Sequence, residues 1–172
     1  MADADIKDFL TALSAAGVKF VVVGAYAVAS HGYVRATADF DVLVEPSASN
    51  AAKLERAVRE FAGTSLEYFG VSVSELSRPR FGFFMGVEPD RIDIMTRIAG
   101  VSFARAWRGH TSTKIQDVDV PVLGLEELIA AKRASSRERA PGTMKALQDA
   151  ADLAWLRGEK KRLLAERRRN GR

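Results

Sequence analysis

The sequence predicts an α+β fold in which a small mixed β-sheet, flanked by helices, is followed by a helical C-terminal portion. Three patterns indicate this class. Residues 18–23 form a β-branched, almost wholly apolar run. Residues 40–44 alternate with Asp39 and Asp41 and then turn apolar, and hydrophobic residues recur at helical spacing from Leu125 onward. With 172 residues, 47% of them hydrophobic and 28% charged, the chain is long enough for one domain with its own core.

Helices are predicted around the first two strands. Residues 3–16 carry apolar side chains at helical spacing, and Gly17 ends that helix. A short helix over about 25–31 follows the first strand. After Pro46 stops the second strand, an amphipathic helix is expected to extend to about Phe61.

The middle of the chain is less regular. The segment 63–80 has no clear hydrophobic period, so no element is predicted there. The patterns beyond it predict strands over 80–86 and 91–95 joined across Glu88–Asp90, a helix near 103–107, and short strands over 111–116 and 118–122. From Leu125 onward two helices are expected, separated by a break at residues 139–142.

These elements predict a single domain over residues 1–156, with the sheet core at about 18–122 and the C-terminal helices at about 124–156. Residues 157–172 form a basic stretch, with eight lysines and arginines against two glutamates. Such a run can attract RNA, DNA or another polyanion, or it can be a solvated helix end that continues into a disordered tail.

Composition excludes several classes of site. The chain has no cysteine, so disulfides, thiolate metal sites and cysteine nucleophiles are ruled out. Its two histidines, His31 and His110, have no spacing for a zinc site or a catalytic triad. The acidic N-terminus is unlike a signal peptide, and no apolar run approaches the roughly 18 residues of a membrane span. We therefore expect a cytoplasmic protein without a membrane segment.

A phosphate-binding geometry is predicted where the first strand ends at Gly24. Glycine lacks a Cβ, so a bound group can approach the backbone closely. The chain then enters a helix, whose first N–H groups are unpaired and favour an anion. Many such joints serve only packing, so this signal is weak when taken alone.

Acidic residues strengthen the interpretation. Asp39 and Asp41 occupy alternate positions of a predicted strand, so their carboxylates point to the same face. Beside apolar neighbours they would repel each other unless a cation lay between them. Asp93 lies within another apolar strand, where an unpaired carboxylate is unfavourable. Oxygen ligands of this kind suit Mg²⁺, and three acids on neighbouring strands can hold two such ions.

Structural alternatives remain for each of these acids. Asp39 and Asp41 are also compatible with two solvated aspartates at the start of a strand. Asp93 is also compatible with a salt bridge to a nearby arginine, such as Arg91 or Arg97.

This order of motifs resembles the DNA polymerase β-type nucleotidyltransferase superfamily. More narrowly, residues 24–44 are similar to the bacterial AbiEii-like branch, and they read GAYAVASHGYVRATADFDVLV. Residues 123–140 and 148–156 resemble the C-terminal helices of that branch, with the sequences LGLEELIAAKRASSRERA and QDAADLAWL. The likeness spans about residues 18–156, which is most of the chain.

The resemblance implies a metal-dependent enzyme that transfers a nucleoside monophosphate (NMP) from a nucleoside triphosphate (NTP) such as ATP to a hydroxyl group, with Mg²⁺ or Mn²⁺. The acceptor would be an RNA 3′ end such as that of tRNA, a protein side chain or a small molecule. Several relatives are toxins of toxin–antitoxin pairs, so the resemblance also implies a toxin role with an antitoxin partner.

Roles for single residues follow from the same resemblance. Asp39 and Asp41 would bind both metal ions, and Asp93 would bind the catalytic metal and help to deprotonate the acceptor hydroxyl. Gly24, with the backbone of Ala25, would cradle the triphosphate. Phosphate contacts are further implied for Arg35, Thr37 and Lys132. The structural alternatives are a surface ion pair for Arg35, an exposed helix charge for Lys132, and a packing role for His31.

Two positions depart from the pattern of the branch. Ala25 stands where the second Gly or Ser is usual, so a hydroxyl contact to phosphate is lost. Gln148 stands where a lysine usually precedes Asp149, so Asp149 and Asp152 are expected to cap a helix or form salt bridges.

Three other functions compete with the enzyme. One is a catalytically inactive, partner-binding or regulatory module that keeps the fold, and another is a basic nucleic-acid-binding protein whose acids are structural. The third, a haloacid-dehalogenase-type phosphatase, also has an Asp-x-Asp motif after an apolar strand. Leu43 occupies the place of its Thr or Val and is followed by Val44, so the phosphate-binding hydroxyl is missing.

Overall fold

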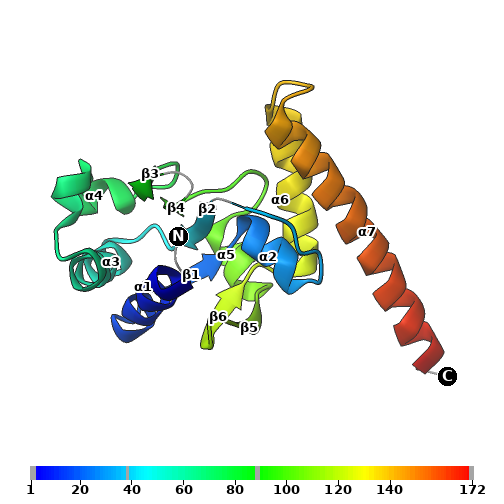
Figure 1. The fold of residues 1–172 in the computed structure, drawn as a ribbon, viewed down its shortest axis with the longest axis horizontal. Helices are drawn as coiled ribbons and strands as arrows, with labels where there is room; N and C mark the ends of the chain where they lie inside the picture. The colour runs from blue at the N-terminus through cyan, green and yellow to red at the C-terminus, as the bar shows by residue number, and fades with distance from the viewer. Residues whose placement is uncertain (1–2, 38, 88–89, 171–172) are drawn as a thin grey trace.

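The computed structural model describes residues 3–37, 39–87 and 90–170. A six-stranded mixed sheet in the order β3-β4-β2-β1-β6-β5 forms its centre, with helices on both faces, as Figure 1 shows. The strands are β1 (Phe20–Val22), β2 (Asp39–Val44), β3 (Gly82–Val87), β4 (Asp90–Met95), β5 (Thr111–Ile115) and β6 (Val118–Val122). The predicted α+β class is confirmed.

The helices account for most of the remaining chain. They are α1 (Asp3–Ala15), α2 (Gly24–Ser30), α3 (Ala48–Ala62), the 3₁₀ helix η1 (Leu66–Phe69), α4 (Val73–Leu76), α5 (Phe103–Arg108), α6 (Leu125–Glu138) and α7 (Met144–Asn170). None of the helices in the described ranges combines the length and the apolar character that crossing a bilayer requires.

Strand β1 lies at the centre of the sheet, as its β-branched run predicts. It pairs antiparallel with β2 and parallel with β6, and β2 pairs parallel with β4. All three β1 residues are buried because helices cover both faces of the sheet. The strand is shorter than the predicted range 18–23.

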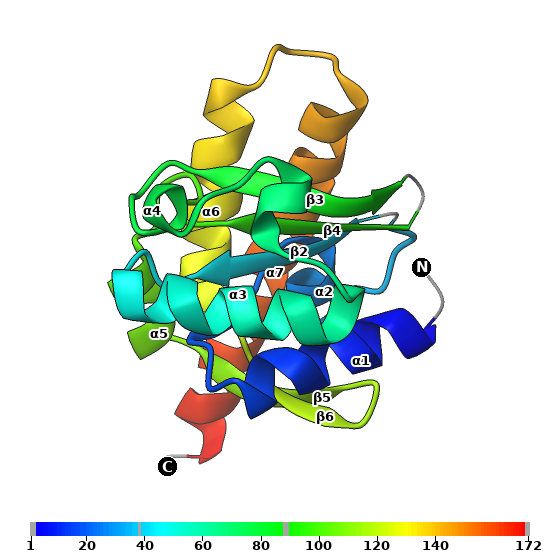
Figure 2. The same cartoon turned by 90° about the vertical axis from the view of Figure 1, so that its left-hand side faces the viewer.

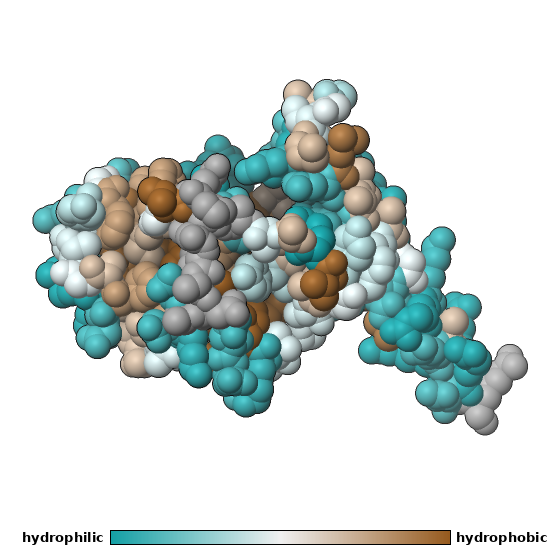
Figure 3. Space-filling model, viewed as in Figure 1, coloured by the Kyte–Doolittle hydropathy of each residue, from teal (hydrophilic) through white to brown (hydrophobic). Residues whose placement is uncertain are grey.

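The two faces of the sheet carry different helices. Helices α1 and α3 pack together on one face, with the rings of Phe9 and Phe61 in edge contact at 5.3 Å between centroids. Helices α2, α6 and α7 lie on the other face, as the two views of Figures 1 and 2 agree. The C-terminal half of α7 projects away from the body, and its surface is hydrophilic (Figure 3). Because α7 continues to Asn170, the basic stretch that begins at residue 157 is helical up to that residue.

The segment 63–80, for which no element was predicted, contains η1 and α4. Helix α4 begins with a capping box, in which the Ser72 side chain accepts from the N–H of Glu75 and the Glu75 carboxylate accepts from the N–H of Ser72. Strand β3 starts at Gly82 rather than at residue 80. Of the predicted turn Glu88–Asp90, residues 88–89 lie outside the described residues.

Candidate active site

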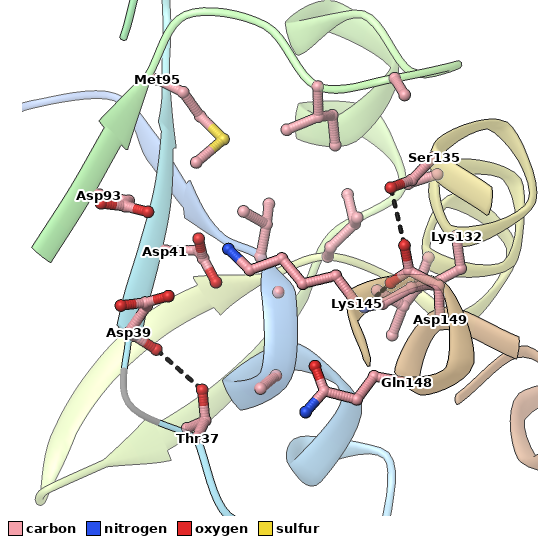
Figure 4. A pocket seen from close by; sticks show the side chains of 18 of the residues that line it. Thr37, Asp39, Asp41, Asp93, Met95, Lys132, Ser135, Lys145, Gln148 and Asp149 are labelled. Atoms are coloured by element: carbon pink, nitrogen blue, oxygen red, sulfur yellow. Dashed lines mark hydrogen bonds and ion pairs between the residues drawn. The ribbon is translucent and has the colours of Figure 1, made fainter. Parts of the chain in front are cut away.

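Three aspartates share one face of the sheet where β2 and β4 run side by side. The parallel register sets Asp41 opposite Asp93, and Asp39 opposite Arg91. Alternate residues of a strand share a face, so Asp39, Asp41 and Asp93 all line one cavity of about 430 Å³. Figure 4 shows the three side chains along one side of this cavity, which we call the sheet wall.

Gly24 lies directly against Asp41. A Cβ built on Gly24 would be 1.9 Å from Oδ2 of Asp41, and the φ of Gly24 is +63°, in the left-handed region. The N–H of Val23 donates to the main-chain oxygen of Asp41 at 3.0 Å. The end of β1 and the middle of β2 are thus held together at a distance that only glycine permits. The next residue, Ala25, is buried and also lines the cavity.

The electrostatics of the sheet wall concentrate on Asp41. Burial and the negative charges of Asp93 and Asp39 raise the pKa of Asp41 from 3.8 to about 6. Lys132 and Lys145 lower this pKa, but less than the other groups raise it. The site therefore places a carboxylate where a nearby cation would be strongly favoured.

Arg91 joins the other two acids. Its Nε lies 2.7 Å from Oδ1 of Asp93, and its Nη2 lies 3.3 Å from Oδ2 of Asp39. The guanidinium group also lies 5.3 Å from the centroid of the Phe84 ring. The salt bridge between Asp93 and Arg91, which was the structural alternative considered for Asp93, is therefore present. Arg91 neutralises part of the negative charge of the sheet wall.

The donor set of this wall fits a hard divalent cation. Oδ1 of Asp39 is buried and has no hydrogen-bond partner within the described part of the chain. In the same ranges, no cluster of three or more acidic, histidine or cysteine side chains is arranged to hold a metal ion as it stands. Mg²⁺ needs only one or two carboxylates when substrate phosphates and water complete its shell. Asp39 and Asp41 meet that requirement.

Helices α6 and α7 form the opposite side of the cavity, which we call the helix wall. Nζ of Lys132 lies 2.8 Å from Oδ1 of Asp149 and 2.8 Å from Oδ2 of Asp152. Ser135 donates to Oδ2 of Asp149 at 2.8 Å, and Nε of Arg139 lies 2.9 Å from the same oxygen. The Lys132 side chain is only 12% exposed, so it is not the exposed helix charge considered in the sequence.

Arg35 belongs to the same network. Its Nε and Nη2 donate to the two carboxylate oxygens of Asp152 at 2.9 and 3.1 Å. Asp152 is fully buried, and although burial raises its pKa, the hydrogen bonds from Arg35 and Lys132 lower it further, to below its ordinary value. Asp149 and Asp152 do form salt bridges, as expected, and these bridges hold three cations that line the cavity, Arg35, Lys132 and Arg139.

The cavity is lined by all the residues for which the sequence predicted a role: Gly24, Ala25, Arg35, Thr37, Asp39, Asp41, Asp93 and Lys132. Thr37 donates its hydroxyl to the main-chain oxygen of Asp39 at 3.2 Å, at the start of β2. His31 lies at the C-terminal end of α2, where its Nε2 pairs with the main-chain oxygen of Leu123 at 2.9 Å, and it does not line the cavity.

Sequence reasoning missed Lys145. Its side chain extends from α7 across the cavity toward Asp41, as Figure 4 shows. Lys145, Gln148, Asp149 and Asp152 are spaced i, i+3, i+4 and i+7, so they share one face of α7. That spacing was readable in the sequence, but the direction of the face was not.

Comparisons with known proteins identify a family and a fold for this chain. The model of a family described as nucleotidyl transferase of unknown function (DUF2204) matches residues 2–168. The fold is similar to that of the antibiotic-resistance factor ANT(2″)-Ia, with a TM-score of 0.56 and 17% identity over 98% of this chain and 96% of that chain. It is also similar to an antigenic nucleotidyltransferase-like protein from Paracoccidioides brasiliensis, with a TM-score of 0.53 and 14% identity over 88% and 74%. Comparison with curated proteins gives no match. Since the family model spans nearly the whole chain, this protein belongs to the DUF2204 family of nucleotidyl transferases.

Proposed function

We propose that the protein is a metal-dependent nucleotidyltransferase that moves an NMP from an NTP to a hydroxyl acceptor and releases pyrophosphate. One observation carries this proposal. Asp39, Asp41 and Asp93 on the sheet wall share a cavity with Lys132 and Lys145 on the helix wall. An acidic wall suits the metal ion of a metal–triphosphate complex, and a basic wall suits its phosphates.

Asp39 and Asp41 would hold Mg²⁺ or Mn²⁺ together with phosphate oxygens of the NTP. The bound ion would neutralise the triphosphate and polarise the α-phosphate toward attack. Gly24 and the backbone of Ala25 line the cavity next to Asp41, where the triphosphate would approach the main chain.

Asp93 would accept the proton of the acceptor hydroxyl. The hydroxyl oxygen bonds to the α-phosphorus, and the bond from that phosphorus to the α,β-bridging oxygen breaks. Pyrophosphate leaves with the electron pair of that bond. Because Arg91 contacts both Asp39 and Asp93, it would keep these carboxylates in place while the substrate binds. The protein then contributes alignment and charge neutralisation.

The cations of the helix wall would bind the phosphates. Lys132 is anchored by two carboxylates, so its ammonium group is fixed at the cavity edge before the substrate arrives. Arg35 lines the cavity, but its guanidinium group donates to Asp152 and to the main-chain oxygen of Ala36, so its predicted phosphate contact would use its remaining N–H groups. Thr37 would act through its bond to the Asp39 main chain.

Three finer proposals rest on the sequence motifs alone. We propose that the protein belongs to the AbiEii-like branch, that ATP is among the NTPs it uses, and that it is a cytoplasmic toxin inhibited by an antitoxin. The acceptor remains a choice between an RNA 3′ end such as that of tRNA, a protein side chain and a small molecule.

The decisive experiment is incubation of the protein with each of four α-labelled NTPs, Mg²⁺ or Mn²⁺, and total cell lysate. We expect label on one class of acceptor and release of pyrophosphate. Asp41→Ala and Asp93→Ala should each abolish the transfer while circular dichroism shows an intact fold. Full transfer by either variant would overturn the mechanism.

A second candidate function is an inactive module that retains the fold. The contacts of Arg91 with two of the three acids favour it, as do Ala25 and Gln148 at positions where the branch has other residues. An inactive module predicts that no NTP with Mg²⁺ or Mn²⁺ raises the unfolding temperature. The enzyme predicts that at least one does.

A further inference from the structure

Arg91 completes a two-by-two block of charged side chains on the sheet wall. In the parallel register of β2 and β4, Asp39 lies opposite Arg91 and Asp41 lies opposite Asp93. Because alternate residues of a strand share a face, the three acids and the arginine form one group. The sequence itself thus places a cation inside the acidic wall.

The guanidinium group of Arg91 lies between Asp39 and Asp93. Its Nη2 donates to Oδ2 of Asp93 at 3.0 Å and lies 3.3 Å from Oδ2 of Asp39. Its Nε lies 2.7 Å from Oδ1 of Asp93, so the same cation contacts both carboxylate oxygens of Asp93. A metal ion can therefore reach Asp93 only if the guanidinium group moves.

The two bridged aspartates differ in the oxygens that remain for a metal ion. Oδ1 of Asp39 is buried and has no hydrogen-bond partner among the residues that the structure describes. Asp39 can therefore bind an ion through Oδ1 while its Oδ2 stays near Arg91. Both oxygens of Asp93 are in contact with Arg91, so the ion that needs Asp93 has to compete with the arginine.

Burial strengthens this competition. The side chains of Arg91, Asp39 and Asp93 are only 18%, 21% and 23% exposed. Opposite charges attract each other more strongly when they are partly shielded from water, and removing one partner leaves the others with an unfavourable buried charge. When no metal ion is bound, Arg91 is the cation that balances Asp39 and Asp93.

An exposed aromatic ring of β3 adds to the hold on Arg91. Phe84 lies opposite Asp93 in the antiparallel pair of β3 and β4, so it is on the same face, and its ring centroid is 5.3 Å from Cζ of Arg91. An aromatic ring at this distance attracts a guanidinium group. The neighbours of Phe84 on this face, Gly82 and Gly86, have no side chains, and Phe84 is 57% exposed. The ring and the guanidinium group therefore have room to move.

We propose that Arg91 is a resident counter-cation that keeps a divalent ion from Asp93 until NTP is bound, an inference that rests on the proposed function. The triphosphate would supply oxygen ligands for the ion and a new anionic partner for the guanidinium group. Arg91 is then a positioning residue, which acts through Asp39 and Asp93. A metal ion alone does not complete the site, and the metal ion together with NTP does.

The first test is a titration of the metal-stripped protein with Mn²⁺ in the absence of NTP, with free Mn²⁺ measured by electron paramagnetic resonance. We expect Arg91→Gln to bind Mn²⁺ at least about tenfold more tightly than the wild type, because the competing cation is gone. Arg91→Lys should stay closer to the wild type, because it keeps the positive charge.

The matched control is Arg97→Gln, since Arg97 is exposed and lines the same cavity. This variant removes one positive charge near the site, and its Mn²⁺ affinity should change by less than about threefold because exposed charges are screened. Equal Mn²⁺ affinity of Arg91→Gln and the wild type, or of Arg91→Gln and Arg97→Gln, would overturn the proposal.

Thermal unfolding separates competition from a purely structural role. In EDTA, Arg91→Gln should unfold at a lower temperature than the wild type, because two carboxylates lose their counter-cation. Mn²⁺ alone should restore much of this loss in Arg91→Gln and change the wild type little. A loss that Mn²⁺ does not restore would assign Arg91 to the fold alone.

Phe84→Ala provides a variant that does not disturb the charges. It should raise the affinity for Mn²⁺ about threefold, because the ring no longer holds the guanidinium group. The control is Val87→Ala, which changes an exposed apolar residue of the same strand on the opposite face. If Arg91→Gln does not fold, an unchanged Mn²⁺ affinity of Phe84→Ala would overturn the proposal.

The outcomes distinguish this inference from the proposed function, because the Mn²⁺ titrations contain no NTP. Transfer of NMP by the wild type together with equal Mn²⁺ affinity of wild type and Arg91→Gln would overturn the role of Arg91 and leave the enzyme standing. Tighter Mn²⁺ binding by Arg91→Gln without stabilisation of the wild type by any NTP with Mn²⁺ would show that Arg91 never releases Asp93. That result would overturn both and support the inactive module.

Discussion

The Cβ position of Gly24 coincides with the carboxylate of Asp41, at 1.9 Å from its Oδ2. The strand–glycine–helix joint was predicted to leave room for a bound phosphate. The structure shows that the missing Cβ first leaves room for an aspartate of the same protein. Gly24 and Asp41 are 17 residues apart in the sequence (41 − 24). They nevertheless form one structural unit, in which the glycine makes room for the carboxylate of the Asp-x-Asp motif.

Gly24→Ala is expected to abolish NMP transfer. The new methyl group would displace the Asp41 side chain from the sheet wall, and the positive φ would add backbone strain of about 1 kcal/mol. The matched control is Gly63→Ala, because Gly63 has a φ of +66° but no atom within 4 Å of its Cβ position. Gly24→Ala should lose more stability in thermal unfolding than Gly63→Ala, because only its methyl group clashes with Asp41, and only Gly24→Ala should lose transfer. Equal activity of the two would show that the position of Asp41 is not critical.

Asp41→Asn is expected to stabilise the metal-free protein at pH 8. The pKa of Asp41 is raised to about 6 in the folded state, so the fold binds this proton more tightly than the unfolded chain does. Its contribution to stability is complete below about pH 4 and is lost as the pH rises through 6. The charged carboxylate then disfavours folding by about 2–3 kcal/mol, and asparagine removes this penalty.

The measurement is urea unfolding of both proteins in EDTA at pH 8 and pH 4. The stabilisation by Asp41→Asn should be present at pH 8 and absent at pH 4. Adding Mg²⁺ with NTP should stabilise the wild type and leave Asp41→Asn unchanged, because the ion would bind the charged carboxylate. A variant that is less stable than the wild type at pH 8 in EDTA would contradict this account.

Much of the sheet wall could be predicted from the sequence, because the patterns that mark its residues are local. Alternation placed Asp39 and Asp41 on one face, and the apolar flanks of Asp93 marked a second strand. The capping box of Ser72 and Glu75 is also a local pattern. It was not used for the prediction, because the segment 63–80 has no clear hydrophobic period.

The helix wall was not predictable in the same way. Arg35 and Asp152 are 117 residues apart, and their pairing depends on how α7 packs across α6. A charge pattern gives the face of a helix but not the partner that this face meets. For the same reason the sequence analysis assigned no role to Lys145, although this lysine lies on the same face of α7 as Gln148 and lines the cavity.

Asp152→Ala is expected to destabilise the fold by about 3 kcal/mol or more. It would leave Arg35 and Lys132, two largely buried cations, without the carboxylate that both contact. The control is Glu126→Ala, which removes an exposed ion pair with Lys160 and should change stability by less than about 1 kcal/mol. Since hydrogen bonds from the two cations lower the pKa of Asp152, its stabilising contribution is present near neutral pH. It is lost as the pH falls through that lowered pKa.

Chemical denaturation at pH 7 and pH 3 checks this prediction. The difference in unfolding free energy between wild type and Asp152→Ala should be large at pH 7 and smaller at pH 3. A difference that does not change with pH would show that the loss comes from the volume of the side chain rather than from its charge.

Lys145→Ala is expected to weaken NTP binding about tenfold while the chemical step changes less. Lys145 enters the cavity from α7 and points toward Asp41, so its charge is available to the triphosphate that would lie between the two walls. Lys145→Arg should recover part of the affinity because the positive charge is kept. Lys161→Ala is the matched control, since Lys161 is exposed on the same helix and does not line the cavity of the aspartates. Steady-state kinetics with the NTP as the varied substrate separates KM from kcat. A fall in kcat with unchanged KM would assign Lys145 to the transition state instead, where the leaving pyrophosphate develops its charge.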